Sequence, residues 1–174
     1  MSDSLVDFVL DSSMTMAWFF EEERTAAADA VLARTGYVRV HVPALWYWET
    51  ANTLSGSLRR KRITPACVKT SFEGLSNLPV VVDEPISFRI RGDVFALAQE
   101  HGLTVYDATY LELALRKGLP LATLDKDLIK AARKAGVALV GEDAPPYWEA
   151  REDGVEIGTP KKTRKRAKKG VKKA

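Results

Sequence analysis

Four acidic residues of this 174-residue chain could together support metal-ion chemistry: Asp11, Glu49, Asp107 and Asp125. If the fold brings them together, two carboxylates about 4 Å apart repel by roughly 1 kcal/mol in water and about 4 kcal/mol at an effective dielectric of 20. A divalent cation relieves this repulsion, and all-oxygen ligands select hard ions such as Mg²⁺ or Mn²⁺. Such an ion can bind a phosphodiester oxygen, ionise a water and stabilise a leaving alkoxide. The four acids therefore predict a metal-dependent nuclease.

The chain pattern places three of these acids where strands end and helices begin. Asp11 directly follows an apolar run, Asp125 follows another run after Leu124, and Asp107 opens a helical segment. In an open parallel sheet, ligands bind at the carboxyl ends of the strands. Glu49 lies inside a long helical segment instead, about a turn and a half after Pro43. We therefore expect the four carboxylates at one edge of a sheet.

Each acid also has a simpler interpretation. Aspartate before a helix is a favoured N-cap that contributes about 0.5–2 kcal/mol, and glutamate is a common helix former. Glu49, however, stands beside the bulky residues Trp46, Tyr47 and Trp48, and a charged residue among such side chains favours a functional role. The joint pattern, more than any single acid, favours a metal site.

Alternation of strand and helix patterns predicts an α/β fold, a three-layer α/β/α sandwich with a mainly parallel five-stranded sheet. The expected strands are Leu5–Leu10, Val38–Val42, Val80–Val82, Leu119–Thr123 and Val137–Val140. The expected helices cover Met14–Phe20, Arg24–Arg34, Ala44–Arg62, Pro65–Leu75, Pro85–His101, Asp107–Lys117 and Asp125–Ala135. We expect one nuclease domain over 1–150 and a disordered tail over 151–174.

The charge of the chain is divided between its parts. Of 26 Lys and Arg, nine lie in residues 161–174, which contain no acid, so 17 basic residues face 23 acids in the rest, a net charge of about −6. We hypothesise that the basic tail binds RNA phosphates without reading sequence. Unchanged RNA affinity at low salt after deletion of residues 155–174 would end that hypothesis.

Several other classes of site are not predicted. The lone Cys67 excludes a disulfide framework and suggests a small buried hydrophobe, and His41 and His101 are too scattered for a zinc centre. Walker A, dinucleotide-binding, G-x-S-x-G and H-E-x-x-H motifs are all absent from the sequence. Without a basic leader or an apolar run of about 20 residues, a cytoplasmic location is expected.

Four segments resemble the successive motifs of PIN-domain ribonucleases, most closely the VapC toxins of bacterial toxin–antitoxin pairs. They are VLDSSMTMAWF (9–19), PALWYWETANTL (43–54), LTVYDATYLELA (103–114) and LPLATLDKDLIKAA (119–132). The resemblance implies that Asp11, Glu49, Asp107 and Asp125 are both catalytic and metal-binding. It further implies Mg²⁺ or Mn²⁺ dependence, endonucleolytic cleavage of RNA, homodimerisation and neutralisation by a VapB-like antitoxin.

Four further residues are accessory candidates: Asp127, Ser12, Thr123 and Asn52. The resemblance suggests a further acid near the fourth and small hydroxyl residues beside the site, whereas helix-dipole and turn roles explain the same residues without catalysis. Three alternatives stay open: a PIN nuclease of RNA processing, a catalytically degenerate RNA-binding module and a haloacid dehalogenase-like phosphatase. The last requires a second Asp two residues after Asp11, where Ser13 stands.

Overall fold

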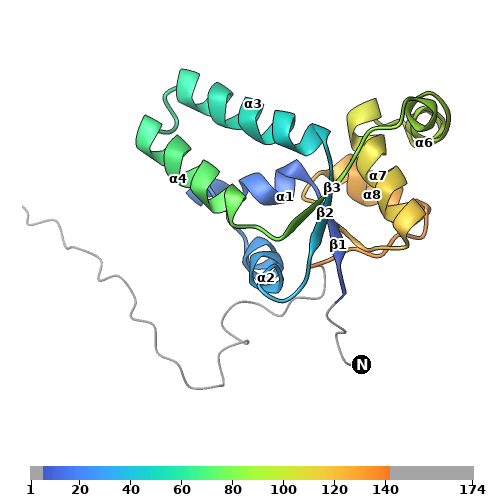
Figure 1. Ribbon diagram of the computed structural model, residues 1–174, viewed down its shortest axis with the longest axis horizontal. Helices are drawn as coiled ribbons and strands as arrows, with labels where there is room; N and C mark the ends of the chain where they lie inside the picture. Colours follow the sequence, from blue (N-terminus) through green and yellow to red (C-terminus); the bar gives the residue numbers. More distant parts are fainter. Residues whose placement is uncertain (1–5, 142–174) are drawn as a thin grey trace, which may run out of the picture.

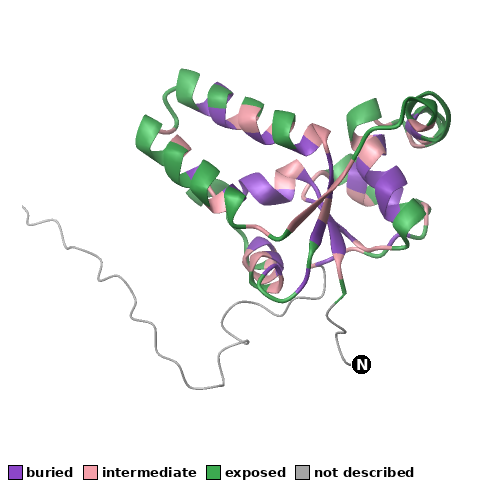
Figure 2. Cartoon of the chain, in the orientation of Figure 1, coloured by how far each residue is buried: buried purple, intermediate pink, exposed green. Residues whose placement is uncertain are grey.

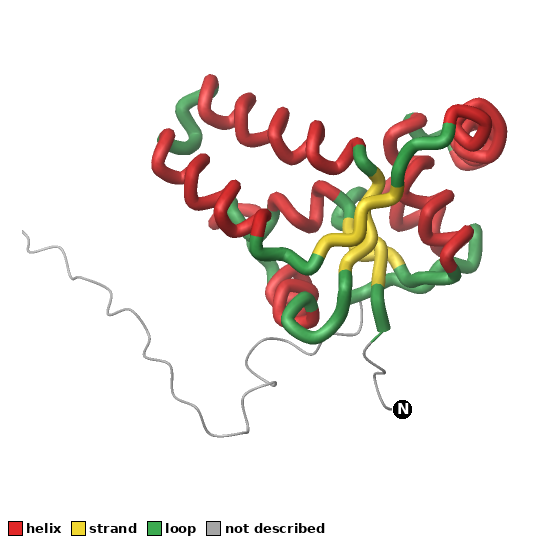
Figure 3. The backbone as a smooth tube through the Cα atoms, in the orientation of Figure 1, coloured by secondary structure: helices red, strands yellow, loops and turns green. Residues whose placement is uncertain are grey.

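The computed structural model describes residues 6–141, so the expected tail over 151–174 lies outside the described residues. Its sheet has four parallel strands: β1 (Phe8–Leu10), β2 (Val40–Pro43), β3 (Val80–Asp83) and β4 (Leu121–Ala122). Their order is β3-β2-β1-β4, with β1 pairing with both β2 and β4. The strands lie at the centre of the molecule between helices (Figures 1 and 3). The chain runs outward from β1 through β3 and returns to the other side of β1, so the topological switch point lies between β1 and β4.

The fifth strand that we expected over Val137–Val140 is wrong. This segment forms a single parallel bridge between Leu139 and Leu121, flanked by hydrogen bonds from Leu121 N to Ala138 O and from Val140 N to Leu121 O. Strand β4 has only two residues and therefore offers too short a partner for a further strand. The edge of the sheet consequently ends in one bridge.

Helices cover both faces of the sheet (Figure 1), which confirms the α/β/α sandwich. On one face lie α1 (Ser12–Met16), α2 (Ala26–Arg34), α3 (Leu45–Arg59) and α4 (Pro65–Ser76), with a short 3-10 turn, η1 (Glu21–Glu23), between α1 and α2. On the other lie α6 (Phe95–His101), α7 (Val105–Lys117) and α8 (Lys126–Lys134). The expected helix over Pro85–His101 is divided into α5 (Ser87–Arg89), a π-helical turn, η2 (Ile90–Val94), and α6.

Capping residues explain where most helices begin and end. The hydroxyls of Thr25, Thr64 and Thr104 accept amide hydrogen bonds at the starts of α2, α4 and α7. Because Thr104 caps α7, that helix begins two residues before Asp107, which was predicted to open it. Gly102 ends α6 with φ 67°, a left-handed conformation that glycine adopts without a Cβ penalty.

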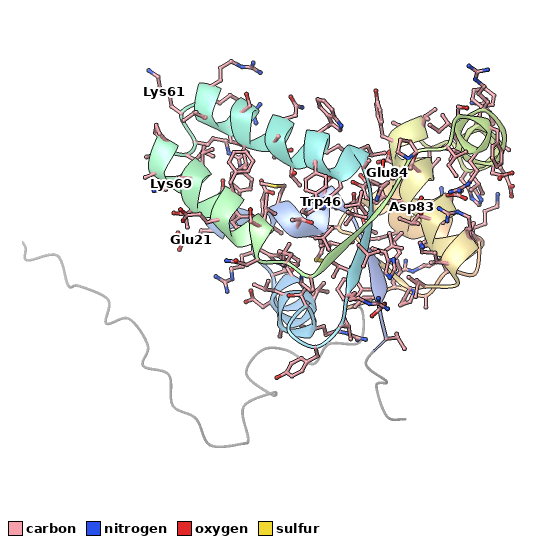
Figure 4. All side chains as sticks on the ribbon, viewed as in Figure 1. Glu21, Trp46, Lys61, Lys69, Asp83 and Glu84 are labelled. Atoms are coloured by element: carbon pink, nitrogen blue, oxygen red, sulfur yellow. The ribbon has the colours of Figure 1, made fainter. Side chains whose placement is uncertain are left out.

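A continuous apolar core lies between the sheet and its helices (Figure 2). Trp46, labelled in Figure 4, is fully buried, and its indole Nε1–H donates to Thr15 Oγ1 of α1 at 3.0 Å. This bond fixes the first turns of α3 against α1, immediately before Glu49. Cys67, by contrast, is exposed in the first turn of α4, so the expectation of a buried cysteine is wrong.

A charged cluster joins the end of β3 to the last turns of α7. Arg116 donates to Glu112 and to Asp83, each at 2.7 Å, and Arg89 lies 3.5 Å from Asp83, which is labelled in Figure 4. These hydrogen-bonded ion pairs fix the orientation of α7 against the sheet. They consequently help to set where Asp107, the acid at the start of α7, lies.

Candidate active site

Asp11 lies at the centre of the candidate site, at the carboxyl end of β1. Its backbone N–H donates to Ala122 O of β4 at 3.0 Å, which places it at the switch point, and only 4% of its surface is exposed. Its carboxylate accepts hydrogen bonds from Ser13 Oγ at 2.5 Å and Thr123 Oγ1 at 2.7 Å. Burial raises the pKa of Asp11 in spite of these bonds, and the nearby Asp107 raises it further.

Two hydroxyl side chains connect Asp11 to the loop that follows β4. Ser13 Oγ accepts from the backbone N–H of Leu124 at 3.0 Å, and Thr123 Oγ1 accepts from the N–H of Asp125 at 3.0 Å. The Ser13–Leu124 bond and the Thr123–Asp11 bond span 111 and 112 positions of the chain and are therefore tertiary, whereas the Thr123–Asp125 bond is local. They hold Asp125 beside Asp11 through its backbone.

Glu49 faces the same place from the first half of α3. One of its oxygens, Oε2, accepts a short hydrogen bond from the hydroxyl of Tyr110, a fully buried residue of α7. Burial is the largest influence on the pKa of Glu49 and raises it to about 7, with further upward contributions from Asp11 and Asp107. The hydroxyls of Tyr110 and Ser12 act in the opposite direction. None of these neighbours is a cation.

Asp107 occupies the first turn of α7. Its Oδ2 accepts from Thr104 Oγ1 at 2.6 Å, and its backbone N–H donates to the same hydroxyl at 3.1 Å. Since its charge acts on the pKa values of both Asp11 and Glu49, the three carboxylates share one electrostatic environment. Burial, Asp11 and Glu49 likewise raise the pKa of the Tyr110 hydroxyl, which keeps it a hydrogen-bond donor.

Asp125 is the N-cap of α8, with its Oδ1 accepting from the backbone N–H of Leu128 at 2.8 Å. Its position beside Asp11 is therefore set by Thr123, while its carboxylate is turned toward the helix. The capping interpretation of this residue is thus realised in the structure.

As they stand, the carboxylates do not form a closed metal site: within residues 6–141 there is no group of three or more His, Cys, Asp or Glu side chains placed to hold one ion. Asp107 and Asp125 are turned toward capping contacts at Thr104 and Leu128. The donor chemistry nevertheless fits a hard cation, because the neighbouring donors are carboxylate and hydroxyl oxygens and the charge of Asp107 raises the pKa of both Asp11 and Glu49.

The accessory candidates divide into two pairs. Thr123 and Ser12 lie at the site, with Thr123 bonded to Asp11 and Ser12 Oγ 3.4 Å from Asp11 Oδ1. Asn52 and Asp127 are exposed on α3 and in the first turn of α8.

The sequence interpretation missed two residues that contact the acids, Ser13 and Tyr110. Helical spacing could have indicated Tyr110, because it stands three residues after Asp107 and so shares a face of α7 with it.

Comparison with known proteins gives the family. The model of the PIN domain matches residues 8–134. This chain belongs to the PIN-domain family. Ribonuclease VapC3 of Pyrobaculum aerophilum is 32% identical to this PIN-domain chain over 120 residues, which cover 69% of the chain and 90% of the relative. Ribonuclease VapC3 of Mycobacterium tuberculosis is 34% identical over 109 residues, covering 63% of the chain and 74% of the relative.

A solved structure supports the same fold. The crystal structure of PAE2754 from Pyrobaculum aerophilum has a TM-score of 0.55 and 27% identity, and the match covers 73% of this PIN-domain chain and 80% of that chain. The resemblance to VapC-type PIN ribonucleases predicted from the four motifs is confirmed. Within the described part of the chain, the helices lack the length and hydropathy that crossing a membrane requires.

Proposed function

We propose that this PIN-domain protein is a metal-dependent endoribonuclease that hydrolyses RNA phosphodiesters. The observation that carries the proposal is the convergence of Asp11, Glu49 and Asp107 in one electrostatic environment at the switch point of the sheet. A folded chain gains no stability from three mutually repelling carboxylates, one of them fully buried, so their proximity favours binding of a cation. The two relatives named ribonuclease support RNA as the substrate.

In this proposal Asp11, Glu49, Asp107 and Asp125 hold Mg²⁺ or Mn²⁺. When bound, the ion supplies positive charge that polarises the phosphodiester and favours ionisation of water. Ser13 and Thr123 hold the Asp11 carboxylate in one orientation by donating to it. To hold the ion, Asp107 and Asp125 would change side-chain rotamer and leave their present contacts with Thr104 and Leu128, each worth about 1 kcal/mol.

Cleavage of RNA in the presence of Mn²⁺ tests the proposal. Asp11→Asn keeps the shape of the side chain and both of its hydroxyl neighbours but removes the charge. We expect it to lower cleavage by more than roughly 100-fold, the upper end of what loss of an outer-shell partner of a metal costs. Asp93→Asn is the matched control, since it makes the same change at an exposed residue of η2 and should cleave normally. Full activity of Asp11→Asn, or undiminished activity in EDTA, would refute the proposal.

We further propose that the protein is the toxin of a toxin–antitoxin pair and is neutralised by a VapB-like antitoxin. The support is its similarity to relatives that carry the name VapC. RNA as substrate agrees with the cytoplasmic location that the sequence suggested. Growth arrest on expression of the wild type, with normal growth on expression of Asp11→Asn, is the expected result. Two results together would favour the alternative of an RNA-processing nuclease. Cells expressing an active wild-type enzyme would grow normally, and no small neighbouring gene would encode a product that binds the chain.

Homodimerisation is proposed through an apolar surface beside the site. A pocket of about 280 Å³ there is lined by five exposed apolar side chains from the start of α3, the segment after β3 and the start of α7: Trp48, Ile86, Ile90, Val105 and Tyr106. Trp48 is 78% exposed, and clustered exposure of this kind marks an interface rather than a solvated surface. We expect the wild type to have the mass of a dimer in light scattering and Trp48→Lys that of a monomer. A monomeric wild type at micromolar concentration would refute this proposal.

A further inference from the structure

We infer that Tyr110 is a positioning residue that holds the carboxylate of Glu49 in the place from which it binds the metal ion. The inference rests on the proposed metal site and adds to it a residue from outside the four acids. It is drawn from one contact, the hydrogen bond that the Tyr110 hydroxyl donates to Glu49 Oε2. That contact joins α3 to α7 across 61 positions of the chain.

Burial explains why this contact constrains Glu49. The whole of Tyr110 is inaccessible to solvent, and its neighbours Leu111 and Leu113 are core residues, so the phenol ring has almost no room to move. Its hydroxyl lies at the only polar end of a buried ring, and leaving it unsatisfied would cost about 1–3 kcal/mol. The hydroxyl therefore occupies a fixed point, and the Glu49 carboxylate is held at that point.

The hydrogen bond holds the Glu49 carboxylate at a position from which it can help to bind a cation. With Oε2 bonded to Tyr110, the Glu49 carboxylate stays within electrostatic range of Asp11 and Asp107. Asp107 and Asp125, in contrast, bond to groups of their own helix ends and are not fixed in this way. A carboxylate has about four acceptor sites and this bond uses one, so capacity for an ion remains.

The donor role also explains why a tyrosine is suited to this place. A phenol donates a hydrogen bond without adding positive charge, so it orients Glu49 while leaving the negative charge of the cluster for the cation. An arginine or lysine at the same position would neutralise Glu49 and compete with the metal ion. Hydrogen-bond donors that orient metal-binding carboxylates change metal affinity typically by 10–100-fold.

The test is the affinity of the full chain for Mn²⁺, measured by isothermal titration or electron paramagnetic resonance without RNA. Tyr110→Phe removes only the hydroxyl, and we expect it to weaken Mn²⁺ binding by about 10–100-fold. Tyr37→Phe makes the same change at a tyrosine that is 76% exposed and outside the site, so it should bind Mn²⁺ as the wild type does. In cleavage, Tyr110→Phe should require more Mn²⁺ for half-maximal activity while KM for RNA at saturating Mn²⁺ stays unchanged.

A double-mutant cycle separates positioning from a general loss of structure. If Tyr110 acts through Glu49, adding Tyr110→Phe to Glu49→Gln weakens Mn²⁺ binding no further, whereas a merely structural contribution would weaken it again. Should Tyr110→Phe fail to fold, Glu49→Asp serves instead, because it keeps the charge but withdraws the carboxylate from the hydroxyl. It is then expected to bind Mn²⁺ at least 10-fold more weakly than the wild type.

The outcomes distinguish this inference from the proposed function. The role of Tyr110 would be overturned, and the metal site left intact, if Tyr110→Phe bound Mn²⁺ with wild-type affinity while Glu49→Gln bound it more weakly. Where Tyr110→Phe does not fold, wild-type affinity in Glu49→Asp would have the same meaning. Undiminished Mn²⁺ binding in both Asp11→Asn and Glu49→Gln would overturn the metal site and the inference with it.

Discussion

The most quantitative prediction concerns Glu49 in the metal-free protein. Burial and the neighbouring acids raise its pKa from the ordinary value of 4.5 to about 7. Below about pH 4.5 the carboxyl is protonated in both the folded and the unfolded chain. Between these values the unfolded chain releases the proton and the folded chain keeps it, so stability falls as the pH rises. Above about pH 7 the contribution of Glu49 is constant.

The size of this effect follows from the two pKa values. Their difference corresponds to about 3.4 kcal/mol at 1.36 kcal/mol per pH unit. Glu49 is only partly buried, so we reduce this figure by about half for solvent screening, to roughly 1.5 kcal/mol. For a domain of this size, a change of that magnitude shifts Tm by roughly 3–6 °C.

Thermal unfolding in EDTA between pH 4.5 and pH 8 measures the prediction. Glu49→Gln is uncharged throughout, so its Tm relative to the wild type should rise by roughly 3–6 °C across this interval. Glu73→Gln provides the matched control, because it makes the same change at a glutamate that is exposed on α4. The Glu73 carboxylate lies 3.8 Å from the Nζ of Lys69, which is exposed as well. Parallel Tm curves for the wild type and Glu49→Gln would refute the reasoning. Added Mn²⁺ should stabilise the wild type more at pH 8 than at pH 5.5, because the ion binds the deprotonated carboxylates.

Three further predictions concern the groups that hold the acids. Thr123→Val removes the donor to Asp11 and the acceptor for the Asp125 N–H, so it should lower the free energy of unfolding in urea by about 1–3 kcal/mol. Thr123→Ser should keep most of the stability, and equal values for the two variants would contradict this. Thr104→Ala removes the N-cap of α7 and should cost about 0.5–2 kcal/mol in the same assay, and an unchanged midpoint would show that this cap is dispensable. Leu111→Ala leaves a cavity under the sheet and should cost about 2–5 kcal/mol, a loss that calorimetry can confirm or contradict.

Much of the fold could be predicted because its causes are local. Thr64 before Pro65 and Gly102 after His101 marked helix boundaries that the structure confirms, since cap chemistry depends only on adjacent residues. The alternation of strands and helices likewise indicated a parallel sheet covered on both faces. Where the prediction failed, a distant partner decided the result: Val137–Val140 is not a strand because β4 is only two residues long.

The sequence alone also predicted the elements that carry the four acids. Asp11 had to follow a buried strand, and Asp125 had to begin a helix, because both positions follow from neighbouring residues.

Only the tertiary structure decided which way these side chains point and what they touch. The contact of Tyr110 with Glu49 and that of Thr123 with Asp11 join segments 61 and 112 positions apart. Hydrogen bonds reach about 3 Å, and one residue of extended chain already spans more than that. Only the packing of α3 and α7 on the sheet could therefore bring Tyr110 to Glu49, and only the pairing of β1 with β4 could bring Thr123 to Asp11.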